Sequence, residues 1–397
     1  MQKIYLDNAS TTRISGEVLN EMLPVFADVY GNSSSLHSFG RDSMALVDNA
    51  RDRIARTINA TRSEIFFTSG GTEANNWAII GLAKALESKG RHIITSKIEH
   101  PSVLSACKKL EEEGFRVSYL NVNETGLVDL GELLHEIDDE TILVSIMAAN
   151  NEIGTIQNIK TIAQLAHEKD IVFHTDASQA LGSFRIDVND LGIDAMTMSA
   201  HKIGGPKGIG ALYLKKGLSI EPIIVGGEQE RGKRAGTLNT PAIVGFGKAC
   251  ELVTFNYILD NRKLKTIRDY FVSKVMEEIE NVSINGHLHQ RLPGLVSLSF
   301  ASVDGEALMC LLDLSGIAVS TGAACSTGSV EPSHVILALG KTVEEAKSTV
   351  RFSFSTSNTK DEIDYVVDVL KKSVARLRNL SPIRPSKDKD KGDVENV

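Results

Sequence analysis

Short apolar and β-branched runs alternate with amphipathic stretches from about Ser63 to Leu214. Several runs are too apolar to alternate with polar positions, as expected for strands that are covered on both faces of a sheet. Alternation of such strands with helices predicts an α/β fold with a mostly parallel seven-stranded sheet. The predicted strands are Glu64–Thr68, His92–Ser96, Arg116–Leu120, Leu143–Ala148, Ile171–Thr175, Ala195–Ser199 and Gly210–Leu214, and the helices between them include Thr72–Glu87, Pro101–Glu113 and Ile162–Lys169.

The order of elements changes near Asp260, which predicts a second, smaller α+β domain. We expect a large domain over residues 16–259 and a small domain made of residues 1–15 and 260–380. Residues 381–397 are rich in lysine and aspartate without an apolar pattern, so we expect a disordered tail there. The elements expected in the small domain are a long helix to Glu280, the strands Gly294–Phe300 and Thr349–Ser353, and the helices Gly305–Ser315 and Lys360–Arg378.

Composition narrows the function classes. The 397 residues carry a formal charge of −8, which argues against nucleic acid as the main partner. The first ten residues hold no apolar signal-like stretch, and no run approaches a membrane-spanning length, so we expect a cytoplasmic protein without a membrane partner. The four cysteines form no CxxC pair, which argues against a disulfide framework and an intrinsic metal site.

Polar residues follow five of the predicted strands. Ligands of an open parallel sheet bind beyond the carboxyl ends of its strands, so these residues predict one site along that rim. The segments are Ser69-Gly70-Gly71-Thr72-Glu73, Glu99-His100-Pro101, Asn150-Asn151-Glu152, Asp176-Ala177-Ser178-Gln179 and Ala200-His201-Lys202.

The turn at Ser69–Thr72 leads from a strand into a helix, and its glycines allow a close approach of the backbone to a ligand. Free N–H groups at a helix start suit a phosphate, although an ordinary turn capped by Thr72 would have the same sequence. Asp176 ends a strand that should be buried, where a carboxylate needs a cation such as a protonated pyridine nitrogen. A helix-capping role is the alternative for Asp176, and Gln179 and Asn151 carry the same ambiguity.

Lys202 and His100 are the candidate basic groups of this rim. A Schiff base with a carbonyl cofactor would remove the cost of placing Lys202 there, whereas an exposed loop lysine is the commoner situation. His100 could stack on an aromatic ring or relay a proton, or be structural.

Cys325 lies in a run of small residues, 320–329, that should be mobile, which makes it the best candidate for an exposed nucleophilic thiol. Cys310 reads as a buried core position, and Cys107 and Cys250 read as packing residues in helices. Arg351, on a likely apolar strand, suits a bidentate grip on a carboxylate, with a structural ion pair as the alternative.

Seven motifs occur in an order that resembles the class V, fold-type I pyridoxal-phosphate enzymes, above all the cysteine desulfurases of the NifS/IscS type. The resemblance extends from the Tyr5–Thr12 segment to about Arg378. The motifs are Thr68-Ser69-Gly70-Gly71-Thr72-Glu73, Glu99-His100-Pro101, Asn150-Asn151-Glu152-Ile153-Gly154, His174-Thr175-Asp176-Ala177-Ser178-Gln179, Ser199-Ala200-His201-Lys202, Arg234-Ala235-Gly236-Thr237, and the Cys325 loop with Glu331-Pro332-Ser333-His334.

The resemblance implies a cysteine desulfurase that converts L-cysteine to L-alanine and keeps the sulfur as a persulfide on Cys325. It further implies a pyridoxal 5'-phosphate cofactor, a homodimer with shared active sites, and a sulfur-acceptor protein such as an iron–sulfur scaffold, with which Cys325 could share a transient cluster. The resemblance implies that Lys202 attaches the cofactor, that Gly71, Thr72, Ser199, His201 and the partner subunit's Thr237 bind its phosphate, and that Asp176 pairs with its pyridine nitrogen. Gln179 and Asn151 are implied to lie near the ring oxygen and His100 to stack on the ring. The implied catalytic residues are Lys202, Cys325 and His100, and the implied substrate-binding residues are Asn151 and Arg351, the latter for the substrate carboxylate.

Two alternatives stay open at this stage. One is a related lyase that acts on selenocysteine or a cysteine derivative and depends less on Cys325. The other is a non-catalytic sulfur carrier or assembly scaffold, against which the presence of both Lys202 and Asp176 argues. The tail after Ser381 lacks the family's scaffold-binding sequence, so the acceptor is not identified.

Overall fold

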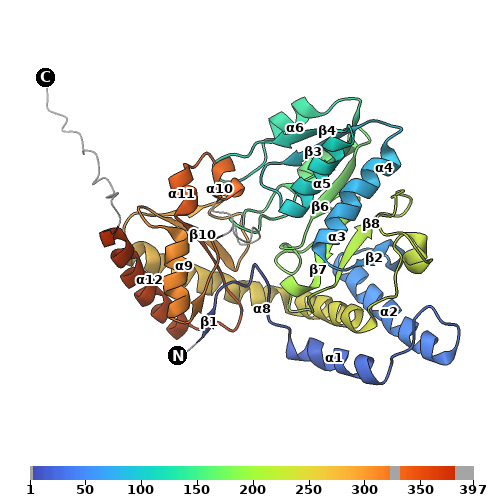
Figure 1. The fold of residues 1–397 in the computed structure, drawn as a ribbon, viewed down its shortest axis with the longest axis horizontal. Coiled ribbons are helices and arrows are strands. Elements are labelled where there is room, and N and C mark those ends of the chain that lie inside the picture. The colour runs from blue at the N-terminus through green and yellow to red at the C-terminus, as the bar shows by residue number, and fades with distance from the viewer. Residues whose placement is uncertain (1–2, 322–330, 381–397) are drawn as a thin grey trace.

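The computed structural model describes residues 3–321 and 331–380. Cys325 and the predicted tail at 381–397 lie outside these ranges. Figure 1 shows a larger part built around a twisted sheet and a smaller part that carries both termini of the described chain, with the long helix α8 extending from one part into the other.

The central sheet has seven strands in the order β2-β8-β7-β6-β5-β3-β4. Strands β3 to β7 pair in parallel, whereas β8 is antiparallel to both β2 and β7. The mostly parallel sheet is therefore confirmed. Four strands have the predicted bounds, and the ends of the other three differ from the prediction by at most three residues. The strands are β2 (Ile65–Thr68), β3 (His92–Ser96), β4 (Arg116–Leu120), β5 (Thr141–Ser145), β6 (Val172–Asp176), β7 (Ala195–Ser199) and β8 (Gly210–Leu214).

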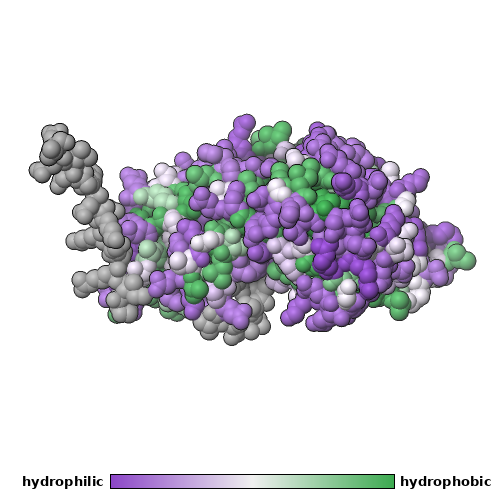
Figure 2. Space-filling view, turned by 90° about the horizontal axis from the view of Figure 1, so that it is seen from above, coloured by the Kyte–Doolittle hydropathy of each residue, from purple (hydrophilic) through white to green (hydrophobic). Residues whose placement is uncertain are grey.

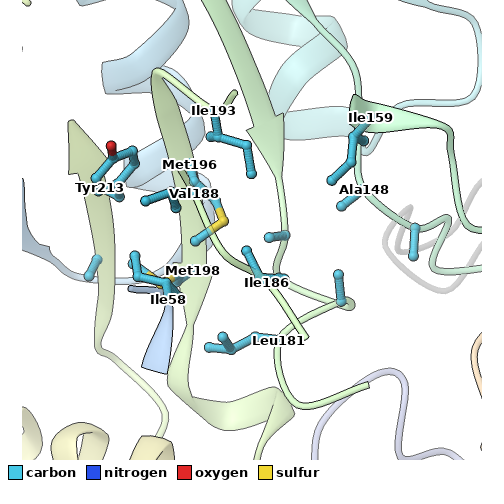
Figure 3. Packing of buried hydrophobic residues seen from close by; sticks show 14 of the residues in the cluster. Ile58, Ala148, Ile159, Leu181, Ile186, Val188, Ile193, Met196, Met198 and Tyr213 are labelled. Carbon is cyan, nitrogen blue, oxygen red and sulfur yellow. The ribbon is translucent and has the colours of Figure 1, made fainter. Parts of the chain in front are cut away.

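Helices cover both faces of this sheet, which is why five of its strands (β2, β3, β5, β7 and β8) are buried at every position. One face packs against α2, α7 and the start of α8 in the largest apolar cluster, where Met196 and Met198 of β7 lie beside Tyr213 of β8 (Figure 3). The other face packs against α3, α4 and α5. The helices of this part are α1 (Gly16–Ala27), α2 (Ser38–Thr57), α3 (Gly71–Asn76), α4 (Leu82–Leu86), α5 (Pro101–Glu112), α6 (Leu130–Glu136) and α7 (Ile159–His167), with a π-helical stretch at Trp77–Gly81 between α3 and α4.

The smaller part has its own apolar core, which includes Ile4 and Leu6 from the chain start. Its antiparallel sheet has the order β12-β10-β9, and β9, a short strand that the sequence pattern did not predict, pairs with β10. A two-residue parallel pair, β1 with β11, ties the N-terminal segment to this part. The elements are β1 (Ile4–Tyr5), β9 (Val282–Asn285), β10 (Leu295–Phe300), β11 (Ile317–Ala318), β12 (Thr349–Ser353), α9 (Gly305–Leu314), α10 (His334–Ala338), α11 (Val343–Lys347) and α12 (Lys360–Leu380).

Helix α8 (Thr240–Glu278) is continuous through residues 259 and 260, so the expected domain boundary falls inside one helix. Its length and composition would also allow it to cross a membrane, contrary to the expectation that no run approaches that length. In the fold it is a core helix that packs against α1, α2 and α12. Gly247 permits this packing, because a Cβ there would lie 2.6 Å from the Cα of Ala50 on α2.

The free thiols on helices differ in burial. Cys107 and Cys250 are buried, as expected, whereas Cys310 is exposed and its prediction as a core residue is wrong. Helix α9 buries Leu308 and Leu312, four positions apart, and Cys310 midway between them lies on the other side of the helix. Hydrophilic residues cover most of the face in Figure 2, and apolar residues gather there in separate patches.

Candidate active site

The N-terminal segment crosses the rim of the large sheet and organises the candidate site. Lys202 Nζ donates hydrogen bonds to the backbone carbonyl oxygens of Ala9 and Ser10, at 2.5 and 2.8 Å. Gln179 Nε2 donates to the same Ala9 oxygen at 2.7 Å. Lys202 is half-buried rather than an exposed loop lysine. The carboxyl ends of β6 and β7 thus bring Lys202 and Gln179 together, as the rim argument predicted.

Asp176 is the last residue of β6 and is buried. Asn75 Nδ2 donates to its Oδ2 at 2.6 Å, and the backbone N–H of Ser178 donates to its Oδ1 at 2.8 Å. Both donors are neutral. Within the described ranges Asp176 forms no ion pair, so its charge is balanced by hydrogen bonds alone and leaves the site receptive to a cationic ring nitrogen.

A pocket of about 340 Å³ lies at the start of α3. Ser199 Oγ is buried and has no hydrogen-bond partner among the described residues, although it lines this pocket. A Cβ at position 71 would lie 2.9 Å from Ser178 Oγ, so a larger residue than Gly71 would displace that hydroxyl. An orphan hydroxyl beside free helix N–H groups suits a phosphate. The pocket is lined by Thr11, Ser69, Gly70, Gly71, Thr72, Glu73, Ser199, His201, Lys207 and Gly208.

His201 is held neutral beside this pocket. Its Nδ1 lies 3.1 Å from Thr11 Oγ1. Burial, together with the positive charges of Lys202 and Lys207, lowers the pKa of His201 to about 4. A neutral imidazole can offer one N–H to an anion without adding charge.

His100 caps α5, which begins at Pro101 as predicted. Its Nδ1 accepts from the backbone N–H of Ser102 at 3.2 Å and lies 2.8 Å from Ser102 Oγ. Burial lowers the pKa of His100 below its ordinary value, against the opposing effect of Asp176. The imidazole is therefore neutral near pH 7.

Arg351, on β12, links the smaller part to the N-terminal segment and to the rim. Its Nη2 donates to Asp7 Oδ1 at 2.8 Å and to Ser10 Oγ at 2.6 Å, and its Nη1 donates to the carbonyl oxygen of Asn151 at 2.8 Å. The structural ion pair considered for Arg351 is thus present. Its Nε is buried without a partner among the described residues, which leaves one N–H for a further acceptor.

Both ends of the segment that contains Cys325 are anchored beside the site. Near the end of the described range 3–321, Ser320 and Arg351 exchange two backbone hydrogen bonds. Near the start of the range 331–380, Ser333 Oγ donates to Glu152 Oε2 at 2.5 Å, and His334 Nε2 lies 3.0 Å from the carbonyl oxygen of Glu99. Cys325 itself lies outside the described residues.

The Arg234–Thr237 loop does not join the pocket within this chain. Thr237 is exposed and is absent from the pocket lining. Arg234 instead pairs with Glu73, with its Nε and Nη2 at 2.8 and 3.0 Å from the two carboxylate oxygens. The contact found for Asn151, another predicted site residue, is through its backbone: its carbonyl oxygen accepts a hydrogen bond from Arg351 Nη1.

Sequence reasoning missed three buried polar side chains behind the rim: Asn75, Glu99 and Ser102. Burial raises the pKa of the Glu99 carboxyl to about 8, and its Oε2 has no partner among the described residues. Each lies within or next to a motif that was identified, yet no role was assigned to it. The N-terminal run Asp7–Thr12 was noted only as part of the resemblance, although its polar residues between a short strand and a helix were a usable signal.

A family model described as aminotransferase class-V matches residues 4–366. The chain therefore belongs to the aminotransferase class-V family, in agreement with its fold and with the strand-end site. The predicted family and fold class are confirmed.

The relatives narrow the function within that family. The chain is 50% identical over 384 residues to the cysteine desulfurase IscS of Clostridium botulinum, covering 96% of this chain and 97% of the relative. It is 42% identical over 386 residues to the cysteine desulfurase of Rattus norvegicus, covering 96% and 85%. A solved NifS-like protein superposes with a TM-score of 0.89 at 37% identity, covering 94% of this chain and 100% of that one. The predicted cysteine desulfurase function is confirmed.

A second solved structure is SspA in complex with cysteine. It is 36% identical to this chain with a TM-score of 0.81, and the match covers 90% of this chain and 100% of that one.

Proposed function

We propose that this chain holds pyridoxal 5'-phosphate at the rim and uses it to move sulfur from L-cysteine onto Cys325. Asp176 carries the proposal, because a buried carboxylate with two neutral donors and no ion pair among the described residues needs a cationic partner. A protonated pyridine nitrogen meets that need. When bound, the ring withdraws electrons from the substrate's Cα and so weakens the bonds of that carbon.

The residues present fit the two ends of this cofactor. The partnerless hydroxyl of Ser199, with Gly71, Thr72 and neutral His201, would hold the phosphate. Lys202, whose amine faces the carbonyl oxygens of Ala9 and Ser10, would be the attachment point. Gln179 and Asn151 would lie near the ring oxygen, and His100 would stack on the ring.

Substrate binding would use Arg351. Its Nε–H is the donor left over after Asp7, Ser10 and Asn151 are satisfied, so a substrate carboxylate would complete the guanidinium contacts. The Lys202 amine, freed on substrate binding, would take the Cα proton.

Cys325 would then receive the sulfur. Its thiolate would attack the substrate sulfur and the bond between that sulfur and Cβ would break. The electron pair of that bond would stay on the three-carbon product, which takes up a proton and departs as L-alanine, while a persulfide remains on Cys325. The contacts of Ser320 with Arg351 and of Ser333 with Glu152 support this role, because they place described residues on either side of Cys325 next to the rim and β12.

A homodimer would complete the site. Thr237 is exposed and does not line its own chain's phosphate pocket, so it is available to a second subunit. Large apolar side chains are also exposed: Phe26, Tyr30, Leu36 and Phe39 around α1 and α2, and Phe255 on α8. Light scattering after gel filtration should give the mass of two chains for the native protein, and a monomeric mass at micromolar concentration would contradict this part of the proposal.

The sulfur acceptor would be another protein, such as an iron–sulfur scaffold, with Cys325 as a transient shared ligand. This partner and the cytoplasmic location stay predictions.

Two measurements test the proposal. Borohydride reduction followed by peptide mapping should attach the ring irreversibly at Lys202 in the native protein, and Lys216→Ala, an exposed lysine, serves as the matched control. Mass spectrometry after addition of cysteine should show one added sulfur on Cys325. Sulfide and alanine release without sulfur on Cys325 would favour the lyase alternative, and a purified protein that binds no cofactor would favour the carrier alternative.

A further inference from the structure

Three buried side chains, Asn75, Ser102 and Asp176, form a continuous series of hydrogen bonds with half-buried His100 behind the rim. Asn75 Nδ2 lies 2.6 Å from Asp176 Oδ2 and 2.9 Å from Ser102 Oγ, and Ser102 Oγ lies 2.8 Å from His100 Nδ1. We propose that Asn75 and Ser102 are positioning residues that hold His100 in the tautomer with its proton on Nε2 and couple it to Asp176.

Asp176 determines which atoms donate and which accept in this series of hydrogen bonds. A carboxylate accepts hydrogen bonds only, so the Asn75 atom that faces it must be the amide nitrogen. The same nitrogen has a second hydrogen, which goes to Ser102 Oγ. Asn75 Oδ1, on the other side of the amide, is buried and accepts no hydrogen bond from the described residues. The amide therefore keeps its two hydrogen bonds to Asp176 and Ser102 although its oxygen has no donor there.

The hydroxyl hydrogen of Ser102 has one acceptor in this series, His100 Nδ1. Because its Oγ accepts from Asn75, its O–H is directed to His100 Nδ1, the remaining polar neighbour at 2.8 Å. The backbone N–H of Ser102 donates to the same nitrogen at 3.2 Å. With two donors on Nδ1, the neutral imidazole carries its proton on Nε2.

This arrangement also opposes protonation of His100. A proton on Nδ1 would face two donors and would break both hydrogen bonds, so the network favours the neutral form. Burial acts in the same direction on the pKa of His100, as do the charges of Lys202 and His334, whereas Asp176 opposes them. His100 therefore presents an N–H donor at Nε2 and stays uncharged. Its use in catalysis rests on the proposed function, but its tautomer and charge do not.

The test measures His100 directly. Hydrogen–deuterium exchange at the imidazole C2, followed by mass spectrometry across a pH series, reports the pKa of a single histidine. Tryptic cleavage after Lys97 and Lys108 gives a peptide in which His100 is the only histidine. The protein is used with its cofactor and without cysteine, so desulfurase activity does not enter the result. The variants are Ser102→Ala, Ser102→Thr and Asn75→Ala, and Ser105→Ala on the exposed side of α5 is the matched control.

We expect Ser102→Ala to raise the pKa of His100 by about 0.5 to 1, because the neutral form loses one neutral hydrogen bond. Asn75→Ala should also raise the pKa of His100, by a smaller amount, and it tests the series of hydrogen bonds at the end next to Asp176. Ser102→Thr and Ser105→Ala should keep the native value. A Ser102→Ala or Asn75→Ala titration that superposes on the native curve, or an equal increase in Ser105→Ala, overturns the inference. Failure of the proposed function would appear separately, as absence of sulfur on Cys325.

Discussion

Arg351 and Asp7 form an ion pair of 2.8 Å that joins strand β12 to the N-terminal segment. The Arg351 side chain is 4% exposed and that of Asp7 is 19% exposed, so the pair is poorly screened by solvent. Because the same N-terminal segment supplies the carbonyl oxygens that contact Lys202, this pair connects the two parts of the chain at the site itself.

Asp7→Asn should lower the free energy of unfolding by about 1–3 kcal/mol, because it leaves a buried guanidinium without its charge partner. Urea denaturation measures the loss. Asp139→Asn, an exposed aspartate on a turn, should change stability by less than about 0.5 kcal/mol. Equal stability of the Asp7 variant and the native protein would show that Ser10 and Asn151 satisfy Arg351 without Asp7.

Glu99→Gln should change how stability depends on pH. Burial raises the pKa of Glu99 to about 8 in the folded protein, above its value of about 4.3 in the unfolded chain. Between these values the unfolded chain has released a proton that the folded protein retains, so this group makes the native protein less stable as pH rises. A neutral glutamine removes that dependence.

The Glu99→Gln variant should therefore gain stability relative to the native protein, on the order of 2 kcal/mol between pH 5 and pH 8. Urea denaturation at several pH values measures the difference, with Glu112→Gln, exposed at the end of α5, as control. A constant difference across this range would mean that Glu99 is ionised in the folded protein.

Thiol labelling should separate the cysteines of the described helices. Cys310 is exposed and should react with iodoacetamide in the native protein. Burial raises the pKa of the Cys107 thiol to about 12 and also raises that of Cys250, so both should react only after denaturation. Peptide mapping by mass spectrometry gives the result, and Cys310→Ser should retain full desulfurase activity. Native labelling of Cys107 would indicate local opening of α5.

The buried pair Arg51–Glu230 should show strong coupling. Arg51 Nη1 and Nη2 donate to the two carboxylate oxygens of Glu230 at 2.7 and 2.6 Å, and both side chains are at most 4% exposed. Either alanine variant should cost about 3–5 kcal/mol, because one buried charge remains unpaired. A double-mutant cycle measures the coupling energy, which should fall below about 1 kcal/mol for the exposed pair Lys160–Asp190. Similar coupling in both pairs would contradict the burial argument.

Much of the large part could be predicted from the sequence, because strand-forming runs and strand-end polar residues are local features. All seven strands were located, and Lys202, Gln179 and Asp176 were assigned to one rim before any geometry was known. The errors arose where local pattern is uninformative. The run around Cys310 is apolar on all sides, so the exposed face of α9 could not be distinguished. Strand β9 alternates apolar and polar residues over only four positions, which is too short a pattern to identify a strand.

The order of apolar runs and turn residues was sufficient to specify a sheet with helices on both faces and the edge at which its chemistry lies. This is so because side-chain period and helix-start preferences act over a few neighbouring residues. Folding alone decided which groups became partners: Asp7 with Arg351 across 344 residues, and Asn75 with Asp176 across 101. Such contacts depend on how distant segments are laid against each other, and the energy of a buried polar group is defined only once its neighbours are in place.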